Sequence, residues 1–128
     1  ALGAPVVRVG DVQAEQLAGL ELLVVGSPTR GFNATPAMMA WLNGLAGGAL
    51  KGVRAAAFDT RIDAKTIGFF VFRWLVANNY AFKRLEAALK QKGAALAAPA
   101  GGFYVKASEG PLEEGELERA EAWGKSLL

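Results

Sequence analysis

The chain of 128 residues is short enough for one domain, and its apolar content of 52% is sufficient for a buried core. Its 14 basic and 12 acidic residues nearly balance, which gives no reason to expect a nucleic-acid partner. The absence of cysteine and histidine argues against disulfides, hydrolytic triads and zinc sites. The chemistry left to the chain is that of carboxylates or of a bound cofactor.

The first twenty residues predict little regular structure apart from one short strand. Val6-Val7-Arg8-Val9 is rich in β-branched residues and predicts that strand, and residues 11–20 predict a turn or short helix. Ala1-Leu2-Gly3 is typical of a helix end, where glycine takes the left-handed conformation. Either a helix and a strand precede residue 1, or these residues are a frayed terminus.

The next segment predicts a buried strand followed by a helix. Leu22 to Val25 are four consecutive apolar residues, a pattern typical of a strand covered on both faces. Pro28 ends the strand, since proline has no N–H to donate. Thr35 and Pro36 suit the N-cap and first position of a helix, which we expect to end at the glycines 47 and 48.

The second half of the chain repeats this alternation. Residues 53–58 predict a second buried strand, 66–92 a helical region broken at 78–80, and 94–105 a last strand bent at the glycines 101 and 102. Residues 113–127 predict a final helix, for which we expect a buried stripe of Leu117, Ala120, Trp123 and Leu127. Within the helical region, residues 67–76 are apolar on nearly every side of the helix, which predicts that they are buried or form a homodimer contact.

No membrane or secretion signal is apparent. The first residues lack a basic region followed by an apolar run, and the longest apolar run, 67–77, is too short to span a bilayer. We therefore expect a cytoplasmic protein without a membrane span.

The alternation of strands and helices predicts an α/β fold with a parallel sheet between two helical layers. Ligands of such sheets bind beyond the carboxyl ends of the strands, which draws attention to the loops 27–35 and 59–63. The first offers Ser27, Pro28, Thr29, Arg30, Gly31, Phe32 and Asn33, and the second offers Asp59, Thr60 and Arg61. Each loop alone could be an ordinary turn; two polar loops at one sheet edge favour a site for a planar ligand.

These loops resemble those of the flavodoxin family. Residues 23–31, with Gly26-Ser27-Pro28-Thr29, resemble that family's middle strand and first ring-binding loop, and Phe58-Asp59-Thr60-Arg61 resembles its next strand and second loop. The resemblance implies a three-layer sandwich with strand order 2-1-3-4-5. It also implies an FMN whose ring lies between Thr29–Asn33 and Asp59–Arg61, in a protein that passes electrons to a redox partner.

Two features depart from that family. Nothing in the chain resembles its serine- and threonine-rich phosphate loop, and the first strand and first helix are not seen. We expect a single domain, 1–128, whose first strand and helix precede residue 1; the alternative is that the strands pair differently. The pI of about 9.1 differs from the acidity common in flavodoxins. Three functions therefore remain open: an FMN-binding electron carrier, a flavin-free interaction module that dimerises through 67–76, and a flavin-dependent reductase of quinones or other small substrates.

Overall fold

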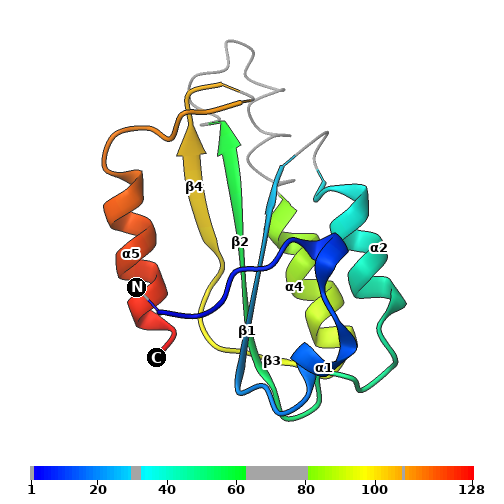
Figure 1. Cartoon of the computed structure of the whole chain (residues 1–128). Helices are drawn as coiled ribbons and strands as arrows, with labels where there is room; N and C mark the ends of the chain where they lie inside the picture. Colours follow the sequence, from blue (N-terminus) through cyan, green and yellow to red (C-terminus); the bar gives the residue numbers. More distant parts are fainter. Residues whose placement is uncertain (1, 30–32, 63–80, 108) are drawn as a thin grey trace.

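The computed structural model describes residues 2–29, 33–62, 81–107 and 109–128, and in them a four-stranded parallel sheet (Figure 1). Strand β1 (Leu22–Pro28) pairs with β2 (Arg54–Ile62), from Leu22↔Arg54 to Pro28↔Thr60. The other edge of β2 pairs first with β3 (Ala95–Leu96) and then with β4 (Gly101–Val105). This order matches the last three strands of the predicted 2-1-3-4-5 arrangement, with the last one interrupted.

The interruption lies earlier than the sequence predicted. Residues 97–100 separate β3 from β4, whereas the glycines 101 and 102 are the first residues of β4. The two short strands follow one line along β2, because β3 pairs at Arg54–Ala55 and β4 at Phe58–Ile62.

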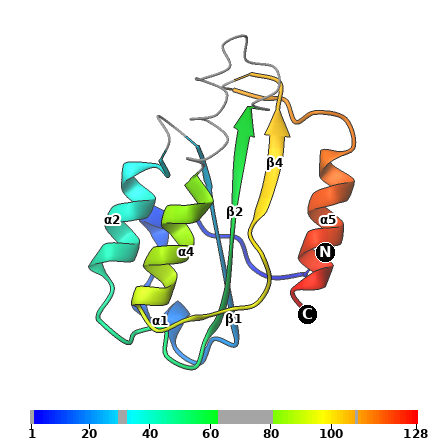
Figure 2. The ribbon, with the colours of Figure 1, turned by 180° about the vertical axis from the view of Figure 1, so that it is seen from behind.

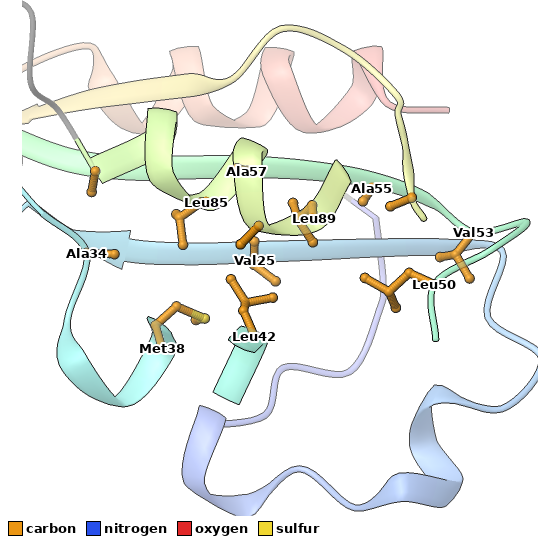
Figure 3. Packing of buried hydrophobic residues seen from close by; sticks show 13 residues of the cluster. Val25, Ala34, Met38, Leu42, Leu50, Val53, Ala55, Ala57, Leu85 and Leu89 are labelled. Carbon is orange, nitrogen blue, oxygen red and sulfur yellow. The ribbon is translucent and has the colours of Figure 1, made fainter. Parts of the chain in front are cut away.

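Helices lie on both faces of the sheet (Figures 1 and 2). Helices α2 (Pro36–Gly44) and α4 (Ala81–Gln91) cover one face, and α5 (Glu116–Ser126) packs beside β4 on the other. In Figure 3, Leu85 and Leu89 of α4 point toward Val25 of β1 and Leu42 of α2, which forms the main core. This is the predicted α/β sandwich.

The start of α2 agrees with the sequence. The Thr35 hydroxyl accepts a hydrogen bond from the Met38 amide at 3.4 Å, and Pro36 occupies the first helical turn. The helix ends at Gly44 with Leu45 as its C-cap, before the predicted glycines. Of the predicted helical region 66–92, the structure describes the part from residue 81 onward, so the break at 78–80 and the apolar segment 67–76 lie outside the described residues.

The face under α5 is built from aromatic rings. Trp123 packs edge-on against Phe58 at 5.8 Å and Phe103 at 5.9 Å between ring centroids, and its indole N–H donates to the Pro99 carbonyl at 2.9 Å. Phe58 lies directly over Gly26, where any Cβ would overlap its ring. Successive residues of β1 thus face opposite layers: Val25 the α4 core and Gly26 this aromatic cluster.

The predicted strand at Val6–Val9 is wrong. Residues 2–8 have no regular structure, Val6 is 97% exposed, and a single 3₁₀ turn, η1 (Val9–Asp11), is followed by the short helix α1 (Ala14–Leu17). Figure 1 shows this segment crossing β2 and β1, and Figure 2 places it behind the sheet when α4 is in front. β-branched residues favour a strand only where a neighbouring strand accepts their backbone, and none is paired with them among the described residues.

The two edges of the sheet differ. The bonds from Arg54 N to Glu21 O and from Thr29 N to Thr60 O show that odd-numbered residues of β1 point their backbone groups toward β2. The backbone groups of Leu22, Val24 and Gly26 therefore point outward, and within the described part of the chain nothing pairs with them. We call this row the open edge.

The β4 edge is covered by the chain itself. Tyr104 donates its amide to Glu116 Oε2 at 2.7 Å and accepts from the Glu113 amide at 2.9 Å. The Arg119 guanidinium donates to the Gly102 carbonyl. The expected stripe on α5 is wrong at Leu117, which is 69% exposed, because the residue before it, Glu116, is turned inward to meet the strand. Leu127 is buried as expected.

None of the helices in the described ranges has the length and apolar content needed to cross a membrane.

Candidate functional site

The two predicted loops begin side by side at the carboxyl edge of the sheet. Ser27 is opposite Asp59 and Pro28 opposite Thr60, and the Thr29 amide donates to the Thr60 carbonyl at 2.9 Å. The residues that the sequence singled out at 27–28 and 59–60 therefore lie next to each other on neighbouring strands. Arg30, Gly31 and Phe32 of the first loop, and the chain that follows residue 62, lie outside the described residues.

Asp59, Thr60 and Arg61 are part of β2, which corrects the prediction that they form a loop. They pair with Gly102, Phe103 and Tyr104 of β4, and β2 continues to Ile62. The apolar pattern that predicted the strand stops at Phe58, but backbone pairing continues because both neighbouring strands reach this far. Since side chains alternate along a strand, Asp59 and Arg61 face the α4 layer and Thr60 faces the α5 layer.

Ser27 and Asn33 shape the path of the first loop. The buried Ser27 hydroxyl donates to the Pro28 carbonyl at 3.0 Å and accepts from the Thr35 amide at 2.9 Å. The Asn33 side-chain oxygen accepts from the Ala34 amide at 2.8 Å. Both side chains bond to the backbone of the loop or of the helix start, so their polar atoms fix the loop ends where they join β1 and α2.

Thr29 and Asp59 bond to the first amides of α4. The Thr29 hydroxyl oxygen accepts from the Ala81 amide at 3.0 Å, and Asp59 Oδ2 accepts from the Phe82 amide at 3.0 Å. These amides lie in the first turn of α4, where the helix itself offers no acceptor. Thr29, directly after β1, and Asp59 of β2 therefore supply the hydrogen-bond acceptors that a local N-cap residue normally supplies. The Asp59 side chain is fully buried.

Arg61 completes this arrangement. Its Nε donates to Asp59 Oδ1 at 2.5 Å, and its guanidinium lies 5.1 Å from the centroid of the Phe82 ring. Gly102 on β4 makes room for it, because a Cβ there would overlap the guanidinium. We refer to Thr29, Asp59 and Arg61, with the amides of Ala81 and Phe82, as the Asp59 network.

The sequence did not reveal this network, because its partners lie 52 and 23 residues apart along the chain. One signal was present: an aspartate that directly follows the buried run Ala55-Ala56-Ala57-Phe58 needs a paired, hydrogen-bonded environment.

The described residues offer no evident site for a metal ion or a phosphate. In the ranges that the structure describes, no group of three or more acidic side chains could hold a metal ion. The hydroxyls of Ser27 and Thr29 at the sheet edge bond to backbone groups of the protein. These two hydroxyls therefore do not form the cluster of converging N–H and O–H donors that phosphate oxygens require.

Comparison with solved structures defines the class of fold. The chain matches oxidised flavodoxin 1 from Bacillus cereus with a TM-score of 0.62 and 18% identity, covering 92% of this chain and 71% of that one. It matches general stress protein 14 from Treponema denticola, in complex with FMN, with a TM-score of 0.59 and 20% identity over 93% of this chain and 75% of that one.

A third similar structure carries a different activity in its name. A thermophilic tryptophan halogenase from Streptomycin violaceusniger matches with a TM-score of 0.57 and 18% identity, covering 90% of this chain and 70% of that one. No protein-family model and no curated protein sequence matches the chain.

The protein therefore has a flavodoxin-like fold, as the resemblance of its loops implied. At identities of 18% and 20% the comparison defines the architecture, and the activity has to be argued from the site.

Proposed function

We propose that the protein binds the isoalloxazine ring of FMN at the carboxyl edge of its sheet and transfers electrons through it. One side of the ring would meet the first loop, through Ser27, Pro28, Thr29, Arg30, Gly31, Phe32 and Asn33. The other side would meet the chain at the end of β2, through Asp59, Thr60 and Arg61. A bound flavin accepts and gives up electrons, and the protein supplies position and electrostatics.

The observation that carries the proposal is the adjacency of the two strand ends. Ser27 and Pro28 are in register with Asp59 and Thr60, so both loops start at the same edge of a flavodoxin-like sheet. General stress protein 14, of which this chain covers 75%, forms a complex with FMN. Backbone amides at such an edge can bond the polar rim of a flat ring, and a glycine such as Gly31 allows either peptide orientation beside it.

Titration of the purified protein with FMN tests the proposal. Binding should quench flavin fluorescence and shift the visible absorption bands, and chemical reduction should bleach the bound flavin. A Gly31→Val variant should change the reduction potential of the bound flavin, because it restricts the peptide beside the ring. A protein that leaves FMN fluorescence unchanged at all concentrations would refute flavin binding.

Flavin-dependent catalysis is tested with the same preparation. If the protein is a reductase, a reduced nicotinamide should reduce the bound flavin and a quinone should reoxidise it repeatedly. A pure carrier should be reduced by chemical reductants and should show no turnover with the reduced nicotinamide.

A flavin-free interaction module is the second candidate. One observation favours it: the hydroxyl of Thr29 and the carboxylate of Asp59 bond to the protein itself. This candidate predicts a dimer whose stability is indifferent to FMN. Sedimentation of the protein with and without FMN, together with Phe70→Glu and Trp74→Glu in the apolar segment, distinguishes it from the flavin carrier.

A further inference from the structure

The Asp59 network joins the bases of both proposed flavin loops to one helix. Thr29 is the last described residue before the first loop, and Asp59 and Arg61 stand near the end of β2. Thr29 and Asp59 bond to the amides of Ala81 and Phe82 at the same helix start. Two side-chain hydrogen bonds therefore join the start of α4 to the ends of β1 and β2, in addition to the apolar packing of the helix on the sheet.

The Asp59 carboxylate and the Arg61 guanidinium are bonded within the protein and largely buried, so a ligand does not reach them. Both carboxylate oxygens of Asp59 accept hydrogen bonds from protein groups, and the side chain has no exposed surface. The Arg61 side chain retains 11% exposure and is held between Asp59, the Phe82 ring and the space left by Gly102. A flavin could contact Asp59 only if these bonds broke first.

We propose that Thr29 and Asp59 are positioning residues: they hold the start of α4 against the ends of β1 and β2, and their side chains do not contact the flavin. The proposal rests on the proposed function for its flavin part and refines it. In the refined proposal, Asp59 and the Thr29 side chain shape the site and are not among the groups that contact the flavin ring. Ring contacts then come from backbone groups and from the other loop residues.

The first test uses the flavin-free protein. In Thr29→Val, the amide of Ala81 should exchange about 5- to 10-fold faster than in the wild type, because it loses its hydrogen-bond acceptor. In Asp59→Asn, the amide of Phe82 should also exchange about 5- to 10-fold faster, because its acceptor loses its negative charge. Thr29→Ser keeps the hydroxyl and should exchange within about twofold of the wild type. Arg54→Met, which removes the bond to the Leu127 carbonyl at the opposite end of β2, is the control for general destabilisation and should leave both amides unchanged.

The second test adds FMN to the same variants. Thr29→Val should weaken FMN binding by about fivefold, and Thr29→Ser should restore it, in step with the exchange of Ala81. If Thr29→Val weakens FMN binding while Ala81 exchange stays unchanged, Thr29 is a direct ligand and the proposal is wrong. If Ala81 exchange rises while FMN affinity is unchanged, the network does not position the site.

The two proposals can fail separately. A wild type that does not bind FMN would refute the proposed function and the flavin part of this inference together. The exchange measurement would still decide whether Thr29 and Asp59 hold α4.

Discussion

Gly26 shows how one missing side chain shapes a whole face of the sheet. The Phe58 ring occupies the place where a Cβ of residue 26 would lie, and it contacts Phe103 and Trp123 in the same layer. In the sequence, Gly26 is notable only as part of the Gly26-Ser27-Pro28-Thr29 motif that resembles the flavodoxin strand and first loop. The structure adds a packing role that depends on a residue 32 positions away, which no local pattern reveals.

Gly26→Ala should therefore destabilise the fold by about 1–3 kcal/mol, because the added methyl group forces the Phe58 ring to move in a packed layer. Chemical denaturation measures this change. Gly44→Ala is the matched control: its new Cβ meets nothing within 4 Å at the end of α2, and alanine favours the helix. Equal effects of the two substitutions would show that the overlap with Phe58 does not matter.

At the scale of elements, the predictable parts were those with local signals. The apolar run of β1, and Thr35 and Pro36 at the start of α2, predicted both elements well. The misjudged parts depended on distant partners. No described strand pairs with Val6–Val9, and Asp59 is held within β2 by β1 and β4 on either side. Local propensity does not contain that information.

The orientation of β1 leads to a prediction about proline. The Val24 N–H points away from β2, and the Val25 N–H points toward it, as the hydrogen bonds of Glu21 and Thr29 indicate. Val24→Pro should cost about 1–2 kcal/mol, whereas Val25→Pro should cost about 3 kcal/mol or more, because only the second removes a bond between strands. Denaturation midpoints of the two variants compare them directly; equal losses would contradict the assigned orientation.

At the scale of the molecule, we propose a site that receives a flavin ring and lacks a separate phosphate site. The scattered positions of the serines and threonines predict this imbalance. At the described sheet edge, the Ser27 and Thr29 hydroxyls bond to the protein backbone. The contacts of Thr29 and Asp59 with α4 could not be predicted, because they depend on where α4 begins in space.

This imbalance predicts the ligand preference of the 128-residue chain. FMN and riboflavin share the ring and differ in the phosphate, so their dissociation constants should agree within about tenfold, equivalent to about 1.4 kcal/mol. Parallel fluorescence titrations measure both. A preference for FMN of a thousandfold would reveal a phosphate site that these residues do not suggest.

The open edge of β1 also affects how copies of the chain can meet. An unpaired strand edge can accept a strand from another molecule, and such pairing often leads to extended aggregates. Here the outward amide and carbonyl of Tyr104 already bond to Glu116 and Glu113, and the outward carbonyl of Gly102 bonds to Arg119. Two molecules that joined through β1 would thus present, at β4, backbone groups that are already bonded, which hinders further growth by strand addition there.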